Sequence, residues 1–370
     1  MDARIGLGMA CLAIHGYGSR AVEEAFRGAL ELPGVTENPR RYGRILWGLW
    51  MCASSFHGFG EAQRLAREMA QLADRNDDLG LKVAAHAARC TNELFAGTVT
   101  AAIEQGRRAQ AIYTPSDHRM LSTRFGDDPG ITCRAVTAWA LWLAGEVAAA
   151  RTEIEAAMIA ADRAGHAPTC GFVHTLAAVL AQRAGDAEGA AAAAQRVLAH
   201  VGESRYPLWT AAAVTLGSWA RVSAGEPAAV TAIEDVVARI DSVMEGSATT
   251  FRLILADAQR QAGAFERAWA TTQTTLAGID TVGDEGLRAE VHIQRGRLAA
   301  AGGDMARARR ELTRVDECAH TRGARIQQLE AAAVRATLAD ATPGETAAAR
   351  EWHERLGEAR FVSHQEPQNS

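Results

Sequence analysis

The sequence predicts an all-α fold in which pairs of helices stack side by side into a right-handed α-solenoid. The first observation is spacing: the glycines that separate helical patterns recur with gaps of 39, 48, 40, 40, 38 and 39 residues, at Gly58, Gly97, Gly145, Gly185, Gly225, Gly263 and Gly302. The second is composition, because alanine-rich segments favour helices that approach closely, and only nine prolines are present. A period near 40 residues with two helices per unit is typical of helical-repeat proteins.

The helical patterns divide into about eight hairpins within a single domain, residues 1–362. Each unit contains a helix, a tight glycine turn, a second helix and a looser connection. The first two units are separated by the loop ELPGVTENP, whose prolines and glycine disfavour helix. The expected hairpins span residues 3–31, 40–75, 78–113, 130–164, 168–201, 207–243, 248–278 and 286–320, with capping helices over 325–357 and a flexible tail at 363–370.

One hairpin shows why the pattern indicates paired helices. In AVTAWALWLAGEVAAARTEIEAA, the spacing of Trp139, Trp142 and Leu143 places them on one stripe of a helix. Gly145 can take the left-handed backbone conformation that ends a helix without a Cβ clash. The alanines at 148–150 then let a second helix lie close to the first. This order of Trp, Leu, Gly and Ala is typical of the tetratricopeptide repeat (TPR), although these units are longer and their consensus is degenerate.

The regular spacing is interrupted once, where the gap of 48 residues implies an insertion of about eight. The additional segment, YTPSDHRMLSTRFGDDPG at 113–130, is long for a connection inside compact repeats, and such connections are usually functional or disordered. A structural interpretation is that Asp127 and Asp128 cap the helix that begins near Pro129. The functional alternative is that polar side chains of this segment line the groove and contact a ligand: His118, Arg119, Arg124, Asp127 and Asp128.

Charge and cysteine usage exclude several classes of protein. The net charge of −5 disfavours a dedicated nucleic-acid binder, which normally carries a strongly basic face. No apolar run reaches 18 residues, so a membrane span is not expected. The six cysteines form no CxxC pair, which disfavours a zinc ribbon or a disulfide framework and favours the reducing cytoplasm. Residues 5–14 resemble a signal-peptide core only weakly, and we interpret them as the first solenoid helix.

Several motifs together resemble the C-terminal TPR region of bacterial multidomain ATPase/adenylate-cyclase-like signalling proteins, over roughly residues 40–320. They are an HR pair with a Gly-Asp-Pro-Gly-type loop, a Leu/Trp-rich helix, a Gly-His-Pro-type turn, a Pro-Leu-Trp helix and an Ala-Glu-x-His-x-x-x-Gly helix. The matching residues are His118, Arg119, Gly126, Asp128, Pro129, Gly130, Trp139, Trp142, Gly165, His166, Pro168, Pro207, Leu208, Trp209, Glu290, His292 and Gly296. The resemblance implies a sensor or protein-interaction module.

The same resemblance implies a cyclase or kinase domain and an AAA-type ATPase module upstream, and this sequence departs from that pattern. It contains no GxxxxGK(S/T) phosphate loop, so no P-loop activity is carried over. The chain is either part of a larger signalling protein or a free-standing relative. No HExxH, GxSxG or comparable motif is present, so we expect no cofactor and no metal, and an enzyme is the less favoured interpretation. The histidines expected on or near groove-lining helices are His57, His86, His118, His174 and His292.

Tryptophan and arginine point to a binding groove. Large aromatic side chains on the first helix of each hairpin either fill the contacts between units or anchor a ligand. With Arg44, Arg119 and Arg124 nearby, a groove for an acidic or carboxylate-bearing ligand is one expectation. The candidate ligand-binding residues are Trp47, Trp50, His86, His118, Arg119, Arg124, Asp127, Asp128, Trp139, His174 and Trp209.

The predicted function is a non-catalytic regulatory module that engages a protein or peptide partner in its concave groove, in bacterial signalling. The first alternative is a small-molecule sensor with an enclosed pocket. The second is an unrecognised enzyme that uses groove His, Asp and Arg residues. A closed, pocketed superhelix would favour a sensor for a small molecule or peptide, whereas an open groove would favour a protein scaffold.

Overall fold

The computed structural model describes residues 2–15, 20–56, 59–202, 206–241, 248–320, 322–357 and 361. Within these ranges the chain is all-α, as predicted, and contains no β-strand. Each hairpin begins with what we call an inner helix; these are α3 (Pro39–Phe56), α5 (Leu79–Ala96), α8 (Pro129–Ala144), α10 (Ala167–Arg183), α12 (Pro207–Ser223), α14 (Ala248–Gln261), α16 (Arg288–Ala301) and α18 (Arg325–Arg335).

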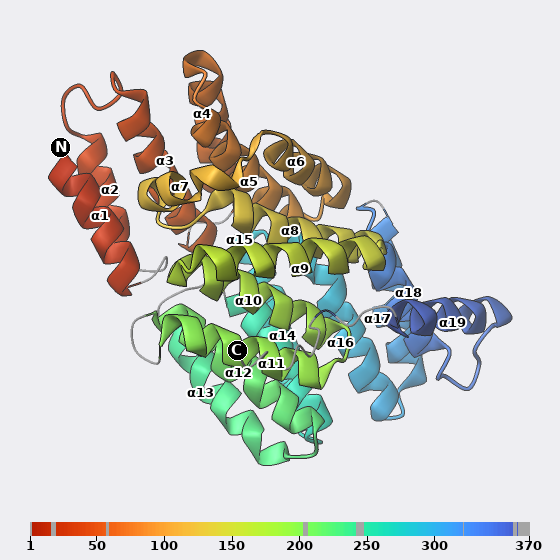
Figure 1. Ribbon diagram of the computed structural model, residues 1–370. Helices are drawn as coiled ribbons and strands as arrows, with labels where there is room; N and C mark the ends of the chain where they lie inside the picture. Colours follow the sequence, from red (N-terminus) through yellow and green to blue (C-terminus); the bar gives the residue numbers. More distant parts are fainter. Residues whose placement is uncertain are drawn as a thin grey trace, which may run out of the picture.

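The second helix of each hairpin is an outer helix. The outer helices are α4 (Phe59–Asn76), α6 (Val99–Ile112), α9 (Val147–Ala164), α11 (Ala187–Val201), α13 (Val230–Asp241), α15 (Phe265–Val282), α17 (Met305–His320) and α19 (Pro343–Gly357). The pair α1 (Asp2–His15) and α2 (Arg20–Leu30) precedes them. Each inner helix contacts the inner helix of the next hairpin, so the inner helices form a continuous layer, and Figure 1 shows the hairpins winding from the N-terminal pair to α19.

The turn glycines have the backbone conformation that the repeat requires, with one exception. Five of the predicted positions lie at positive φ, namely Gly97, Gly145, Gly185, Gly225 and Gly263. Gly302 ends α16 as predicted, but its φ is −81°, and the left-handed residue of that turn is Gly303 with φ +79°. The chain offers two successive glycines there, and spacing alone does not select between them. Gly58, His57 and the expected tail at 363–370 lie outside the described residues.

The insertion at 113–130 is largely helical rather than a loop, which corrects the expectation of a long connection. It contains a short 3₁₀ turn, η1 (Pro115–Asp117), followed by α7 (His118–Phe125), which ends at Gly126 with φ +86°. The helix packs on α3, where the Trp47 indole N–H donates to the carbonyl oxygen of Phe125 at 3.0 Å. Other boundaries shift by a few residues: η2 (Pro227–Ala229) precedes α13, α15 continues to Val282, η3 (Glu285–Leu287) precedes α16, and α18 ends at Arg335.

The superhelix closes on itself, and the sequence carried no signal for this. Helix α18 contacts α8, and η3 contacts α5, although these elements are far apart in the chain (Figure 1). The Val99 backbone N–H donates to the Arg322 carbonyl oxygen at 3.3 Å. The Trp142 ring packs edge-on against Trp352, with ring centroids 6.2 Å apart. The inner helices therefore surround two pockets, described below, rather than one open groove, and we call this enclosed region the channel.

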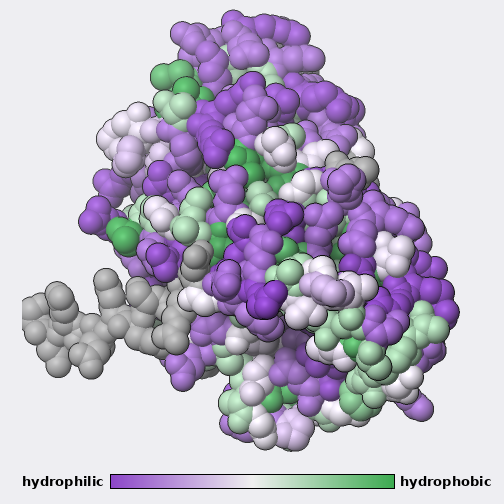
Figure 2. Space-filling model, turned by 90° about the vertical axis from the view of Figure 1, so that its right-hand side faces the viewer, coloured by the Kyte–Doolittle hydropathy of each residue, from purple (hydrophilic) through white to green (hydrophobic). Residues whose placement is uncertain are grey.

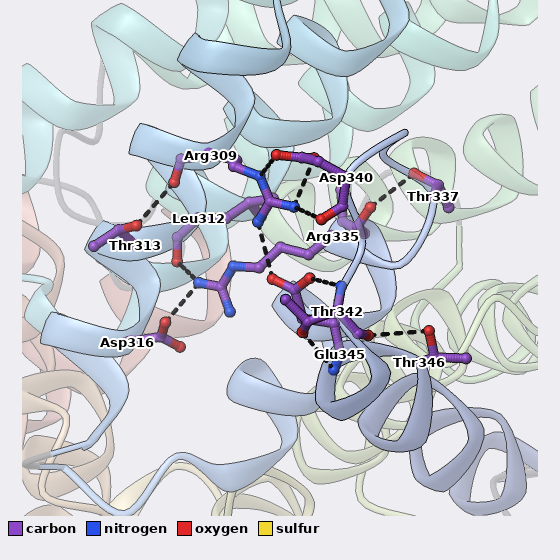
Figure 3. Close-up of polar contacts among 11 residues, drawn as sticks. Arg309, Leu312, Thr313, Asp316, Arg335, Thr337, Asp340, Thr342, Glu345 and Thr346 are labelled. Carbon is purple, nitrogen blue, oxygen red and sulfur yellow. Dashed lines mark hydrogen bonds and ion pairs between the residues drawn. The ribbon is translucent and has the colours of Figure 1, made fainter.

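The C-terminal end of the superhelix is fixed by a polar network, shown in Figure 3. The Arg309 guanidinium on α17 pairs with Asp340 at 2.7 Å and with Glu345 at 2.9 Å. Glu345 also accepts from the Thr342 backbone N–H at 2.8 Å, while its own N–H donates to the Thr342 hydroxyl at 3.2 Å. This reciprocal pattern is a capping box, so one carboxylate both starts α19 and ties it to α17.

Candidate functional site

An apolar pocket of about 210 Å³ lies on the inner face of the superhelix. Each inner helix from α3 to α14 contributes one stripe of side chains to it. The lining residues are Trp47, Trp50, Met51, Ser54, Ala87, Thr91, Phe95, Asp127, Thr132, Cys133, Val136, Trp139, Phe172, Thr175, Leu176, Val179, Leu208, Trp209, Ala212, Thr250, Phe251 and Asp284. We refer to this cavity as the aromatic pocket.

Helical spacing explains why these side chains converge. On α10 the pocket residues Phe172, Thr175, Leu176 and Val179 follow the three- and four-residue steps of one helix face. The same steps occur on α3 and α8, whose stripes face the channel from neighbouring units. One periodic pattern, repeated in consecutive hairpins, therefore builds a concave apolar surface.

Aromatic contacts hold the walls of the pocket in place. The rings of Trp47 and Trp50 lie with centroids 4.7 Å apart, and the Phe172 and Trp209 rings meet edge to face at 5.8 Å. The Trp50 indole N–H donates to Asn92 Oδ1 at 3.1 Å. Because edge-to-face and tilted aromatic pairs are favourable geometries, these rings form a rigid lining.

Trp139 differs from Trp47 and Trp50, whose indole N–H groups both donate hydrogen bonds. Among the described residues its indole nitrogen, which is buried, has no hydrogen-bond partner. The Arg183 guanidinium lies over its ring, 4.6 Å from the centroid, and Phe95 meets the ring edge-on at 5.8 Å. The ring position is thus fixed, while the N–H is left available as a donor.

Two acidic side chains line this otherwise apolar pocket. Asp127 is 5% exposed and Asp284 is 3% exposed. Burial, assisted by the neighbouring Asp128 carboxylate, raises the pKa of Asp127 to about 8, and burial raises the pKa of Asp284 to about 6. The Oδ1 atom of Asp127 has no hydrogen-bond partner among the described residues. Because a buried, unpartnered carboxyl oxygen costs free energy, the pocket favours a ligand that offers a donor to it.

The lining contains no Lys, Arg or His, so the carboxylates meet no compensating positive charge inside the pocket. Its remaining titratable group is the Cys133 thiol, whose pKa is raised by a hydrogen bond to Cys90 and by burial. The expectation of a groove for an acidic ligand is therefore wrong for this pocket. The arginines that suggested it are used elsewhere: Arg124 pairs with Asp78 at 2.8 Å, and Arg44 donates to the Arg124 carbonyl oxygen at 3.1 Å.

The structure brings five of the eleven candidate residues together in the aromatic pocket, namely Trp47, Trp50, Asp127, Trp139 and Trp209. Asp128 caps a helix, which was the structural interpretation of the segment at 113–130. Its side chain is fully buried, caps α8 by accepting from the Gly130 and Ile131 N–H groups, and accepts from Tyr113 at 2.8 Å. His118 Nδ1 lies 2.7 Å from the same carboxylate, and Arg119 is exposed.

The other histidines make contacts outside the pocket. His86 Nδ1 lies 2.8 Å from Gln105 Oε1, and His292 Nδ1 lies 2.8 Å from Glu311 Oε2. His174 points toward outer helices, where its Nε2 lies 2.7 Å from Asp162 Oδ1. Sequence reasoning missed Asp284 as a pocket residue, as well as Phe95 and Phe172. Phe172 shares a helix face with Thr175, Leu176 and Val179, so its spacing could have identified it.

A second cavity of about 240 Å³ lies farther along the inner helices and is polar. The Arg183 guanidinium pairs with Glu290 at 2.7 Å, which joins α10 to α16. Arg297 pairs with Glu330 at 2.8 Å, and the Trp219 indole N–H donates to Asp257 at 2.8 Å. Arg183 therefore contributes to this second cavity and also covers Trp139 of the aromatic pocket.

Comparison with known proteins shows the fold alone. No family model matches the sequence, and no curated protein is significantly similar to it. Among solved structures, the chain is similar to the crystal structure of Rap protein complexed with competence and sporulation factor. The TM-score is 0.57 at 11% sequence identity, and the match covers 97% of each chain. This likeness confirms a TPR-like helical-repeat fold over nearly the whole length. No described helix has both the length and the apolar character needed to cross a membrane.

Proposed function

We propose that this protein is a non-catalytic regulatory module whose aromatic pocket binds a segment of a partner protein or peptide. The observation that carries the proposal is the pocket itself: tryptophan and phenylalanine side chains from consecutive inner helices converge around a concave apolar cavity. Concave apolar sites with a few convergent polar groups are the usual form of binding sites. Tryptophan is also enriched among residues that dominate binding energy.

Pocket size favours a peptide or protein segment over a separate small molecule. The cavity of about 210 Å³ is smaller than the roughly 300–1,000 Å³ that encloses a drug-sized ligand. A volume of this size suits one or two anchoring side chains of a longer chain that continues along the channel. The small-molecule sensor remains the second candidate, and closure of the superhelix into a channel is the observation that favours it.

The polar groups of the pocket further define the ligand. Asp127 Oδ1 lacks a donor, Asp284 lies in the same apolar lining, and aromatic rings surround both. A cationic group, such as a lysine or arginine side chain or a peptide N-terminus, would pair with the carboxylates and pack against the rings. The proposed partner segment is therefore apolar with one positive charge.

The likeness in fold to the Rap protein complex supports a binding role, because that structure is of a helical-repeat protein complexed with competence and sporulation factor. The motifs shared with the TPR region of ATPase/cyclase-like proteins point in the same direction, toward bacterial signalling in the cytoplasm. Both are arguments by analogy with a fold, whereas the ligand class rests on the pocket.

The proposal is tested by selecting peptides from a randomised display library on the full chain. We expect enriched sequences that combine large apolar residues with Lys or Arg. Thr175→Trp fills the pocket from α10, and Thr152→Trp places the same side chain on the exposed surface of α9 as a control. Binding of a selected synthetic peptide should be lost in Thr175→Trp and kept in Thr152→Trp. Equal peptide binding by both variants would show that the peptide does not bind in the aromatic pocket. A rise in melting temperature with a metabolite from a panel, but not with peptides, would favour the small-molecule sensor.

A further inference from the structure

A cluster of two histidines and one aspartate lies outside the aromatic pocket, at the junction of three helices. Asp162 comes from the last turn of α9, His174 from the middle of α10 and His200 from the last turn of α11. Asp162 Oδ1 lies 2.7 Å from His174 Nε2 and 3.1 Å from His200 Nε2. The two imidazole rings are stacked, with centroids 5.4 Å apart and an interplanar angle of 7°. We call these residues the His–Asp cluster.

Three potential ligand atoms are directed at one point in this cluster. One ligand atom from each residue lies within 4.8 Å of the other two. Nitrogen and oxygen ligands at about 2.0–2.2 Å from a zinc ion are separated by roughly 3.3 Å in a tetrahedron, so these side chains need little rearrangement to share an ion.

We propose that Asp162, His174 and His200 form a binding site for a divalent transition-metal ion of the zinc class. Two imidazoles and one carboxylate suit Zn²⁺, Ni²⁺ or Cu²⁺, whereas Ca²⁺ and Mg²⁺ prefer oxygen ligands. This donor set differs from the closed, four-ligand arrangement of structural zinc sites. It provides three protein ligands and leaves a further position for water or another ligand.

The burial of the three side chains suits a metal site that is rigid on one side and open to solvent on the other. The His174 side chain is fully buried, which fixes the orientation of its ring, whereas the side chains of Asp162 and His200 are 41% and 30% exposed. An ion can therefore enter from solvent between α9 and α11. The first helix of one hairpin supplies the fixed ligand, and two outer helices supply the accessible ligands.

Metal binding at this cluster would act on the helix that lines the aromatic pocket. His174 lies on α10 between Phe172 and Thr175, which face the pocket, but it points in the opposite direction, toward the outer helices. An ion held there would connect the hairpin α8–α9 with the hairpin α10–α11. It would fix the position of α10, so ion binding and pocket binding are expected to be coupled.

The test uses the full chain and the metal alone. After treatment with a chelator and dialysis, Zn²⁺ affinity is measured by competition with a chromophoric chelator, and Co²⁺ is used to record visible d–d absorption. His200→Ala and Asp162→Asn each change one accessible ligand and leave the buried ligand His174 in the sequence. His320→Ala is the matched control, because His320 is an exposed histidine in the last turn of another outer helix, α17.

The expected result is one equivalent of Zn²⁺ per chain and a cobalt spectrum of low-symmetry, four- or five-coordinate geometry. Affinity should fall at least tenfold in His200→Ala and in Asp162→Asn and stay unchanged in His320→Ala. Metal-free melting temperatures of the variants are compared with wild type, so that a folding defect is distinguished from ligand loss. Absence of stoichiometric binding by wild type, or unchanged affinity in His200→Ala, would overturn the proposal and leave only a hydrogen-bonded triad.

Discussion

Replacing Asp127 with asparagine should change how the stability of the protein depends on pH. Burial raises the pKa of this carboxyl group from 3.8 to about 8 in the folded protein. For a group whose pKa is raised by folding, stability is fully present below the unfolded pKa and is lost as pH rises toward the folded pKa. Wild-type stability should therefore fall between about pH 4 and pH 8.

The magnitude follows from proton linkage. In this interval the folded state binds one more proton than the unfolded state at Asp127, so the free energy of unfolding falls by about 1.4 kcal/mol per pH unit. A shift of about four units sets an upper bound of roughly 5–6 kcal/mol. Domains are usually stable by only about 5–15 kcal/mol, so water entering the pocket must offset part of this cost. Between pH 5 and pH 8 we expect a loss of about 2–3.5 kcal/mol, which Asp127→Asn should remove.

The assay is urea denaturation at pH 5 and pH 8 at constant ionic strength. At pH 5 the variant and wild type should differ least in stability, because the folded side chain is neutral in both. At pH 8 the stability advantage of the variant should be larger, because only the wild-type side chain becomes charged. Asp304→Asn, which replaces an exposed carboxylate at the start of α17, should leave the wild-type pH dependence unchanged. Asp284, whose pKa burial raises to about 6, will contribute a smaller residual slope. A wild type equally stable at both pH values would refute the reasoning.

Three further predictions concern the scaffold. Asp128→Ala removes the α8 cap and leaves buried donors unpaired, so it should lower the free energy of unfolding by about 3 kcal/mol in urea denaturation. The control Arg119→Ala, at an exposed site, should change it by less than about 0.5 kcal/mol. Gly286→Ala adds a Cβ that would clash with the Leu94 carbonyl oxygen, so it should open the contact between η3 and α5. We expect a lower melting temperature and a larger radius of gyration in X-ray scattering. Unchanged scattering would argue against closure at this contact. Glu290→Gln leaves the Arg183 charge buried without its partner and should lower the free energy of unfolding by about 3 kcal/mol in chemical denaturation.

The repeat could be read from the sequence because each unit states it again. Gly145 marks a turn, the Trp139–Trp142 spacing marks an inner stripe, and the same information recurs in every hairpin. Local rules were less informative where they allow two answers, as at the adjacent glycines Gly302 and Gly303, and in the insertion at 113–130, which is largely helical. Periodicity is local, so it carried no information about closure, which depends on the small rotation that accumulates from one hairpin to the next.

The candidate site was predictable only in its periodic part. Four tryptophans of the pocket lie on predicted inner stripes, whereas Asp284 lies in a short connection whose position depends on closure of the superhelix. The His–Asp cluster was even less predictable from the sequence. Its members are separated by 12 and by 26 residues (200 − 174), which matches no local ligand spacing, and only the packing of three helices brings them together.

If the buried Asp127 carboxyl group also binds the ligand, raising the pH should lower the stability of the free protein and raise its affinity for the ligand. These opposite trends distinguish a binding role from burial alone. In the free protein, ionisation of Asp127 is costly, so stability falls as pH rises toward 8. A cationic peptide pairs only with the ionised form, so its affinity should rise over the same interval, by up to about tenfold per pH unit. Asp127→Asn should remove most of both trends and leave the smaller slope that Asp284 contributes. A carboxyl group that is merely buried would show the first trend and leave peptide affinity independent of pH, and isothermal titration with a selected peptide at pH 6 and pH 8 distinguishes the two.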